Sequence, residues 1–403
     1  MHRRVSSTTD HRCSLGVLHI DFNSSVGPSL GVEVEFELID RDTRQLSSAA
    51  SAILEEIGAG HPGGEHPKAK HELFECTVEI ITGICQTVAE AKADLSGTLA
   101  EVRRSADARG LALVCSGTHP FSDWRDQTVT DNERYHTLMH EMAWMAQRLQ
   151  IFGVHFHVGV RSPEKAVAIA NALAGYIPHL LALSASSPYS EGHDTGLASS
   201  RSKIFEGLPT AGLPEQIVNW AEFEQFMETL VSAEAIGTVR EVWWDIRPHP
   251  DFGTVELRMC DGIPTLREVA ALAALAQSLV HWFDTMHDRG YQLPVHREWV
   301  LRQNKWRAAR YGLEASLIVD DEGDTRPIRE GIVELLDELQ PIAQRLGCTD
   351  ELKDVHQILE RGASYQRQRQ VHDEQGSLVA VVDALAHELA TDEPGARPTE
   401  APR

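Results

Sequence analysis

The segment LGVEVEFELI, residues 30–39, alternates acidic and apolar side chains and therefore predicts a strand with two different faces. Residues two apart on a strand point to the same side, so Glu33, Glu35 and Glu37 share one face and the apolar residues share the other. Glutamate is a poor strand former, and three like charges side by side repel one another. The pattern therefore suggests that the carboxylate face has a function of its own.

Three more segments repeat this alternation and indicate further strands with one apolar and one polar face. They are ELFECTVEII (72–81) with Glu75 and Glu79, IFGVHFHVGV (151–160) with His155 and His157, and GTVELRMC (253–260) with Glu256 and Arg258. A single strand of this kind is most simply interpreted as one with a solvated polar face. Solvated strand faces, however, favour Thr, Lys, Gln and Ser over Glu and His. Taken together, the four strands indicate a functional surface.

Carboxylates that converge on one face of a sheet need a counter-charge. Hard oxygen ligands with one imidazole suit Mg²⁺ or Mn²⁺ better than Zn²⁺. The His-x-His pair at residues 155 and 157 could by itself indicate a zinc site, but no other Cys or His completes one at a familiar spacing. We therefore expect Mg²⁺, with Mn²⁺ as the alternative.

The chain alternates strand-like and helix-like segments without an internal repeat or a regular strand–helix–strand series. Further strands are expected at 111–116 and 240–247. Helical patterns occupy residues 87–109, 132–149, 163–185, 215–235, 265–289, 329–346, 350–361 and 377–390. These features predict an α+β fold with a mainly antiparallel sheet and helices packed on one face.

We predict a single domain over residues 17–390, with a flexible N-terminus (1–16) and a disordered tail (391–403) rich in proline and charge. Segment 186–214 fits neither the strand nor the helix period. A loop of this length within a compact domain is usually functional or mobile, and we expect it to act as a lid.

Charge and cysteine content limit the classes of function. The net charge of −23 argues against general binding to nucleic acid or to anionic membranes, which requires a basic surface. The six cysteines form no CxxC pair and are expected to be reduced, cytosolic thiols. The N-terminal segment lacks the apolar core of a signal peptide, and no run of about eighteen apolar residues occurs. These features predict a cytoplasmic protein.

Nine ordered motifs resemble the carboxylate–amine ligases of the glutamate–cysteine ligase type 2 family. They are GVEVEFELID, VEIITGIC, GTHPF, GVHFHVGV, LALSASSP, DTGLASSR, LPTAGLP, WDIRPHPDFGTVELRMCDG and NKWRAARYGLEA. With the later GASYQRQ, the resemblance runs from about residue 28 to about residue 370. It implies an antiparallel sheet curled into a cup with helices on its outer face, similar to the glutamine synthetase catalytic fold, with Mg²⁺ and ATP on the concave face.

The resemblance also implies ATP-dependent amide formation through an acyl phosphate, with glutamate as the acid and cysteine as the amine. Such chemistry needs positioning and charge neutralisation rather than a protein nucleophile. The motifs do not fix the amine or the acid, so a ligase for another pair of substrates remains open. A non-catalytic Mg²⁺–nucleotide-binding regulatory module and a metal-dependent hydrolase are further alternatives. The first is disfavoured because both Glu-x-Glu and Glu-x-Arg are present, and the second because it leaves the basic residues unexplained.

The resemblance assigns Glu33 and Glu35 to Mg²⁺. Further candidate ligands are Glu79, His155 and Glu256. His157 could be a ligand or could support one. Glu37 and Glu75 are expected to be solvated neighbours without a role in the site.

Basic residues are the candidates for holding anions. Arg258 lies on the strand face of Glu256 and could grip a carboxylate or phosphate with its planar guanidinium. Arg247 is a similar candidate, with a structural ion pair to Asp245 as the alternative. Arg201, within segment 186–214, is expected to close over the acyl phosphate.

A second basic group, NKWRAARYG, is expected to bind the nucleotide through Lys305, Arg307 and Arg310. On a helix, Arg307 and Arg310 share a face while Lys305 points elsewhere. Trp306 and Tyr311 could be core residues or a platform for adenine. The apolar stripes of helices 329–390 lead us to expect a homodimer or a larger homo-oligomer.

Overall fold

A seven-stranded antiparallel sheet forms the centre of the protein, in a computed structural model that describes residues 19–398. The strand order is β2–β3–β1–β5–β9–β8, and β4 pairs with the far end of β1. The strands are β1 (Leu30–Asp40), β2 (Ala69–His71), β3 (Thr77–Ile81), β4 (Leu111–Val114), β5 (Gly153–Gly159), β8 (Ile246–His249) and β9 (Thr254–Asp261). The predicted α+β fold with an antiparallel sheet is confirmed.

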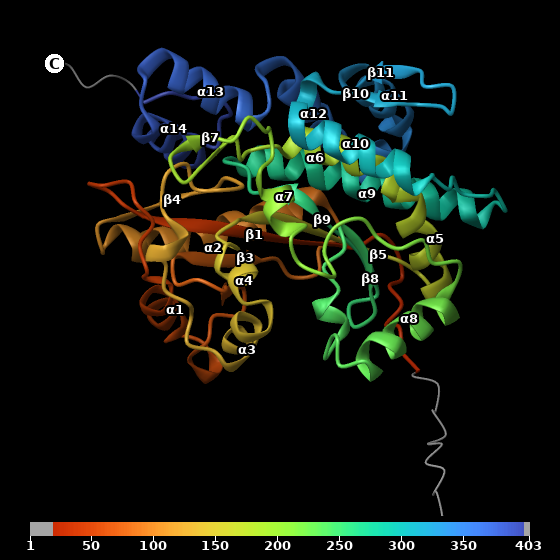
Figure 1. Ribbon diagram of the computed structural model, residues 1–403, viewed down its shortest axis with the longest axis horizontal. Helices are drawn as coiled ribbons and strands as arrows, with labels where there is room; N and C mark the ends of the chain where they lie inside the picture. Colours follow the sequence, from red (N-terminus) through yellow and green to blue (C-terminus); the bar gives the residue numbers. More distant parts are fainter. Residues whose placement is uncertain (1–18, 399–403) are drawn as a thin grey trace, which may run out of the picture.

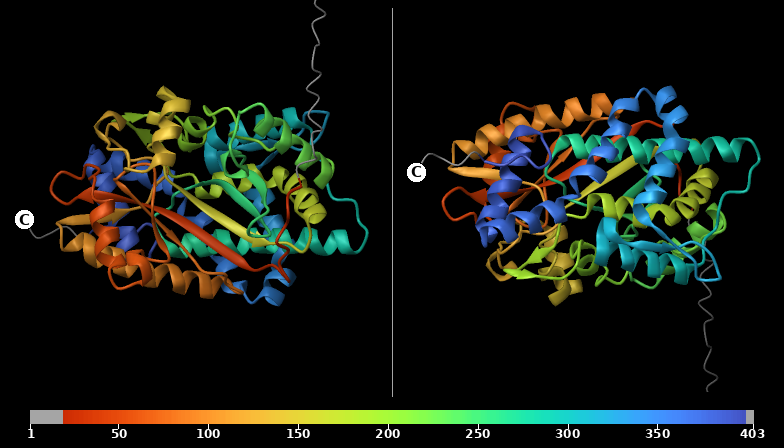
Figure 2. Two further views of the ribbon diagram at one scale, coloured as in Figure 1. Left: turned by 90° about the horizontal axis from the view of Figure 1, so that it is seen from below. Right: turned by 90° about the horizontal axis from the view of Figure 1, so that it is seen from above.

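Helices cover the apolar face of the sheet. The alternation predicted for β1 is observed, so its alternating apolar side chains face these helices. Val32, Val34 and Phe36 are buried in the main core cluster, together with apolar residues of α2 (Val88–Asp107) and α9 (Leu266–Asp288). Figure 1 shows the sheet in the middle layer, with α9 and the C-terminal helices on one side. Seen from above, α2 and α9 lie over the sheet (Figure 2, right). The opposite face of the sheet is therefore left for polar side chains.

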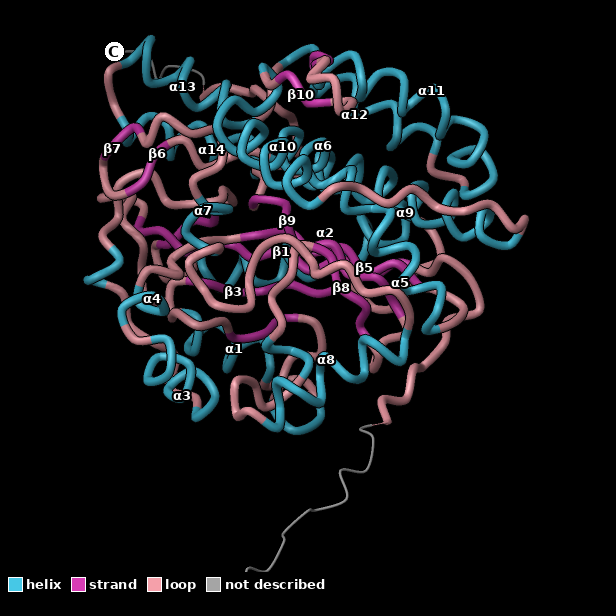
Figure 3. Tube along the Cα trace, turned by 45° about the vertical axis from the view of Figure 1, so that its right-hand side comes forward, coloured by secondary structure: helices cyan, strands magenta, loops and turns pink. Residues whose placement is uncertain are grey.

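Side-chain hydrogen bonds cap the N-terminal ends of α2 and α9. Thr87 and Glu90 form a capping box at the start of α2, and the Thr265 side chain accepts a hydrogen bond from the Glu268 N–H at the start of α9. The remaining helices surround the sheet (Figure 3). They are α1 (Ala50–Gly58), α3 (Glu133–Met142), α4 (Trp144–Gln147), α5 (Pro163–Leu173), α6 (Ile177–Ser184), α7 (Arg201–Phe205), α8 (Trp220–Ser232), α10 (Glu298–Tyr311), α11 (Ile328–Leu346), α12 (Thr349–Arg361), α13 (Ser364–Gln375) and α14 (Leu378–Thr391).

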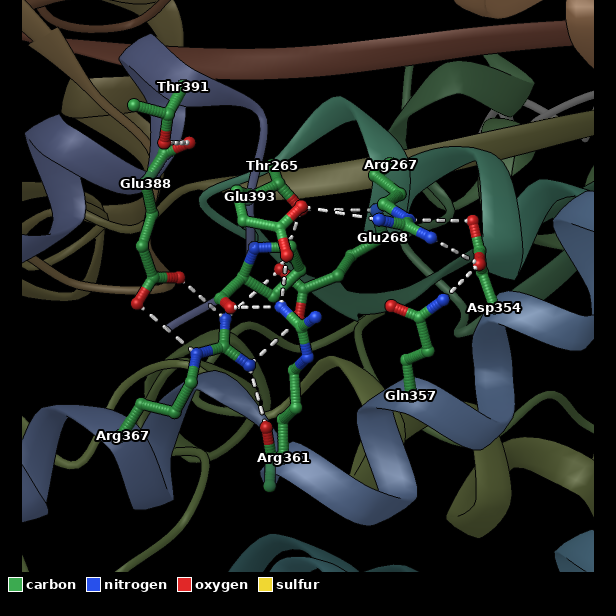
Figure 4. Close-up of polar contacts among 12 residues, drawn as sticks. Thr265, Arg267, Glu268, Asp354, Gln357, Arg361, Arg367, Glu388, Thr391 and Glu393 are labelled. Carbon is green, nitrogen blue, oxygen red and sulfur yellow. Dashed lines mark hydrogen bonds and ion pairs between the residues drawn. The ribbon is translucent and has the colours of Figure 1, made fainter. Parts of the chain in front are cut away.

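A buried ion cluster joins three of these helices. The Arg367 guanidinium of α13 donates hydrogen bonds to Glu268 of α9 at 2.9 and 3.1 Å, and to Glu388 of α14 at 3.2 and 2.8 Å. All three side chains are almost completely buried, and Figure 4 shows them as part of a wider polar network that extends to Arg267 and Asp354. The planar guanidinium thus fixes the C-terminal helices to the helix that covers the sheet.

The start of the predicted tail is held to the body through this network. Glu393 pairs with Arg267 at 3.3 Å and with Arg361 at 2.5 Å (Figure 4). Residues 1–16 and the last five residues of the predicted tail lie outside the described residues.

Two predicted strands differ from those observed. Segment 72–81 is a strand only in its second half, β3. Before β3, the Glu75 carboxylate accepts hydrogen bonds from the backbone N–H and the hydroxyl of Ser51, at 3.0 and 2.5 Å, near the start of α1. Glu75 therefore does not lie on the polar strand face. In segment 240–247 a short 3₁₀ turn comes first, and β8 begins only near its end.

Two predicted helices are interrupted, and segment 186–214 is more ordered than expected. Segment 132–149 divides into α3 and α4 at Ala143, whose φ of +49° leaves the helical region. Segment 163–185 divides into α5 and α6 at a 3₁₀ turn. Segment 186–214 contains the hairpin β6 (Tyr189–Ser190) and β7 (His193–Asp194), followed by α7. A second small hairpin, β10 (Ser316–Ile318) and β11 (Thr325–Pro327), follows α10.

One stretch of the described chain, Pro163–Ser184, is long and apolar enough to cross a membrane. It comprises α5 and α6 and is mostly buried against α9 and β9. It therefore forms part of the protein core.

Candidate active site

The strand register brings the predicted polar residues directly opposite one another. The opposed pairs across neighbouring strands are Glu79–Glu35, Glu33–His155, His157–Glu256 and Glu256–Arg247. Side chains of directly opposed residues lie close enough to interact. Five strands, β3, β1, β5, β9 and β8, therefore contribute to one continuous polar face, four of them predicted by the alternation.

This polar face lines a cavity of about 890 Å³. Eight of the eleven predicted site residues line it, namely Glu33, Glu35, Glu79, His155, Arg201, Arg247, Glu256 and Arg258. Residues of α3 and of segment 234–243 form part of its wall. In the view from below, β1 and β5 run across the middle of the molecule (Figure 2, left). We call the cavity lined by the polar face of the sheet the cup.

Two groups of possible metal ligands meet in the cup. Glu33, His155 and Glu256 offer ligand atoms within 4.8 Å of one another, and so do Glu35, Glu79 and His155. Four carboxylates with a single shared imidazole make an oxygen-rich donor set. Such a set fits Mg²⁺ or Mn²⁺ better than a metal that prefers nitrogen or sulfur.

His155 has one ring nitrogen available as a ligand. Burial, followed by the charge of Arg258, lowers the pKa of His155 to about 4, so the imidazole is neutral. Its Nδ1 lies 3.1 Å from the Glu33 carboxylate. Burial opposes the charge on Glu33, but His157 and His155 outweigh it and hold the Glu33 pKa well below its ordinary value. An ionised carboxylate can only accept, so Nδ1 carries the proton and Nε2 keeps a free lone pair.

Two further carboxylates of the cup, Glu35 and Glu79, are crowded and resist ionisation. Burial, and then the charge of Glu72, raises the pKa of Glu35 to about 8. Burial and the charges of Glu33, Glu72 and Glu35 raise the pKa of Glu79 well above its ordinary value. A cation placed among these carboxylates would favour their ionised forms and relieve their mutual repulsion.

The Glu256 carboxylate forms ion pairs with two arginines. Its Oε2 accepts from Arg247 Nε at 2.7 Å, and its Oε1 accepts from Arg258 Nη1. Burial disfavours its charge, but Arg258 and Arg247 outweigh burial and keep its pKa well below the ordinary value. Arg247 also donates to three backbone carbonyl groups. Arg247 pairs with Glu256, so the alternative pair with Asp245 is wrong.

Arg201 is a buried cation without an anionic partner. It is 4% exposed, its Nε has no hydrogen-bond partner, and it forms no ion pair with the described residues. Its two terminal nitrogens approach only the carbonyl oxygen of Arg258, at 3.4 and 3.5 Å. A buried guanidinium in this state is well suited to receive an anionic ligand. The segment around it, Ser199–Ser202, is buried in the protein and is not the loose lid that the sequence suggested.

The second basic group does not reach the cup. Lys305 is buried and pairs with Asp245 at 2.5 Å and with Glu206 at 2.6 Å. Arg307 donates to the carbonyl oxygen of Ser316.

Arg310 lies over the ring of Tyr311. Trp306 and Tyr311 are about half exposed, and neither lines the cup. Lys305, Arg307 and Arg310 therefore lie apart from the eight predicted site residues that line the cup.

His157 and Glu37 have surroundings that the sequence did not specify. His157 Nε2 lies 3.3 Å from Glu33 and 3.7 Å from Glu256. Burial disfavours the charged imidazole, but Glu256 and Glu33 outweigh burial and raise the pKa of His157, which lies between the two carboxylates. Glu37 is completely buried and accepts from the N–H and hydroxyl of Ser116. The prediction that Glu37 is solvated is wrong.

Glu72 and Tyr135 also line the cup, although no pattern in the sequence indicates them. Burial raises the pKa of Glu72, which therefore adds to the crowding of acids. In segment 72–81, strict alternation would place Glu72 on the apolar face with Phe74. The chain before β3 is not a regular strand, so the alternation does not hold there and gives no indication of Glu72.

Comparison with known proteins identifies a family. Residues 29–388 match the family described as glutamate–cysteine ligase family 2. A Frankia alni protein provisionally named glutamate–cysteine ligase 2-1 is 57% identical over 378 residues, which cover 94% of this chain and 99% of the relative. A Thermobifida fusca protein provisionally named glutamate–cysteine ligase 2 is 52% identical over 375 residues, covering 93% and 94%.

A solved structure shares the fold. It is a glutamate–cysteine ligase from Francisella tularensis in complex with AMP, with a TM-score of 0.67 and 12% identity. The match covers 92% of this chain and 89% of that chain. At this level of identity the likeness concerns the fold alone.

Proposed function

This chain belongs to the glutamate–cysteine ligase family 2, and on that premise we propose that it is an ATP-dependent carboxylate–amine ligase. The proposed reaction joins L-glutamate and L-cysteine to give γ-glutamylcysteine, ADP and phosphate. The observation that carries the proposal is the cup itself, where an oxygen-rich ligand set lies beside a buried arginine without an anionic partner.

The proposed reaction has two steps, a phosphoryl transfer and an attack by the amine. The γ-phosphoryl group of ATP passes to the side-chain carboxylate of glutamate, which gives an acyl phosphate and ADP. The amine of cysteine then attacks the acyl carbon, phosphate leaves and a proton is released. The protein contributes positioning and charge stabilisation, because neither step needs a covalent bond to a side chain.

Mg²⁺, or Mn²⁺ in its place, would be held by Glu35, Glu79 and His155, with Glu33 nearby to orient His155. When bound, it would neutralise phosphate charge during phosphoryl transfer. Glu256 keeps Arg258 and Arg247 in position beside these ligands. Arg201 would bind an anionic group of substrate or nucleotide, which would satisfy its unpartnered guanidinium.

The decisive test is to incubate the protein with ATP, Mg²⁺, glutamate and a panel of amines, and to detect ADP and amide by mass spectrometry. Amide with cysteine supports the full proposal, and amide with another amine keeps the ligase class but changes the substrate. ADP and phosphate without any amide would point to hydrolysis. Nucleotide binding without ADP formation would indicate a regulatory module.

The predicted cytoplasmic location and the predicted homodimer remain predictions. A mass of 44.7 kDa by light scattering, which is that of a single chain, would reject the homodimer.

A further inference from the structure

Three of the family motifs meet at one buried carboxylate, and the serines that contact it precede it by 62 to 75 residues in the sequence. Asp261, the last residue of β9, is completely buried. Its Oδ2 accepts from the Ser186 N–H at 2.9 Å and from the Ser187 hydroxyl at 2.7 Å, and its Oδ1 accepts from the Ser199 hydroxyl at 2.8 Å. The proposed mechanism gives none of these residues a role.

The two hydroxyl groups connect Asp261 to the backbone of Arg201 and Ser202 at the start of α7. Ser187 Oγ donates to Asp261 and accepts from the Arg201 backbone N–H at 3.1 Å. Ser199 Oγ also donates to Asp261 and accepts from the Ser202 N–H at 3.3 Å. Each hydroxyl is thus oriented by the carboxylate so that its lone pairs face the backbone at the start of α7.

Close packing fixes both ends of this connection. A Cβ atom at Gly117 would lie 2.6 Å from Asp261 Oδ2, and a Cβ atom at Gly153 would lie 2.2 Å from Arg201 Nη2. Both glycines are needed because the carboxylate and the guanidinium occupy the space of a side chain. The carboxylate also provides a buried negative charge near Arg201, whose charge in turn opposes the rise that burial causes in the pKa of Asp261.

We propose that Asp261 is a positioning residue for the reaction: through Ser187 and Ser199 it holds Arg201 against Gly153, with its guanidinium turned into the cup. Asp261 itself does not line the cup, so it acts through Arg201. This inference rests on the proposed function for its kinetic consequences, whereas the placement of Arg201 can be tested without activity.

The test uses Asp261→Asn. The amide cannot accept from all three donors, because its Nδ2 is itself a donor, and it also removes the buried charge. In a crystal structure of the variant, we expect the Arg201 guanidinium to have left its place against Gly153. A guanidinium in the same place would overturn the proposal, whether or not the wild-type protein is an active ligase. Absence of amide formation by the wild type would instead overturn the proposed function.

A double-mutant cycle gives the kinetic readout. We expect Asp261→Asn to lower kcat/KM about tenfold or more in the wild-type background, and less than about twofold in an Arg201→Met background. Equal factors in the two backgrounds would show that Asp261 does not act through Arg201. If Asp261→Asn fails to fold, Ser187→Ala removes one connection and keeps the charge, and the same non-additivity with Arg201→Met is expected.

Asp284→Asn is the matched control. Asp284 is a buried carboxylate of α9 that pairs with Lys165 at 2.7 Å, and neither residue lines the cup. Its loss should lower the melting temperature without moving Arg201 or changing the effect of Arg201→Met. A control with the same kinetic pattern as Asp261→Asn would show that general destabilisation explains both, and would overturn the proposal.

Discussion

Glu33 of β1 and His155 of β5 lie directly opposite each other in the sheet, and His155 Nδ1 is 3.1 Å from the Glu33 carboxylate. This contact keeps the proton on Nδ1 and leaves Nε2 free to bind a metal. Glu33→Gln would remove the charge that fixes this arrangement. We expect weaker activation by Mg²⁺, seen as a higher Mg²⁺ concentration at half-maximal ADP formation.

Glu35→Gln tests the metal site more directly. The change keeps the size of the side chain but removes a charge from the proposed ligand set. Turnover should fall by on the order of 10²-fold or more, while the fold persists. Glu75→Gln is the control, because Glu75 contacts Ser51 outside the cup and its loss should leave turnover unchanged. Near-normal ADP formation by Glu35→Gln at saturating Mg²⁺ would refute the assignment.

Arg258→Lys distinguishes substrate binding from charge neutralisation. Lysine keeps the charge next to Glu256 but loses the planar two-pronged contact. If Arg258 grips substrate or transition state, turnover should fall steeply while nucleotide binding measured by calorimetry stays near the wild-type value. Retained turnover would make Arg258 a structural partner of Glu256 only. In that case Arg258→Met should lower the melting temperature, although Arg247 would still pair with Glu256.

Glu37 should make stability depend on pH in the neutral range. Burial raises its pKa to about 8, from an ordinary value of 4.5. Between these values the folded protein holds a proton that the unfolded chain has lost, so the free energy of unfolding falls as pH rises through this window. Glu37→Gln removes this titration. From about pH 6.5 to 8, the urea midpoint of the wild type should therefore fall more than that of the variant, and parallel curves would contradict this.

Arg367→Met tests the buried ion cluster. The change leaves the buried carboxylates of Glu268 and Glu388 without their shared cation, at a cost of about 3–5 kcal/mol in the free energy of unfolding. Arg302→Met is the control, because the pair of Arg302 with Glu298 is exposed and should contribute little. Equal urea midpoints for the two variants would show that the cluster does not stabilise the protein.

The sequence by itself determined the two faces of the sheet. Strand residues alternate with a period of two, so the pattern around Glu33 and Glu35 was sufficient to assign carboxylates to one side and apolar residues to the other. The same reasoning predicted His155, Glu256 and Arg258 on the polar face, and the structure brings all of them to the cup. The motifs likewise identified the family without any coordinates.

Only the tertiary structure decided which charges pair and which groups are buried. Alternation gives the side of a strand but neither its register nor the segments that cross its face. Glu37 shares the face of Glu35, yet Ser116 covers it, and Lys305 turns inward to pair with Asp245. Arg201 lies in a segment without any period, and its place in the cup depends on contacts with residues distant in the sequence. Such contacts form only when the chain folds, and no local pattern encodes them.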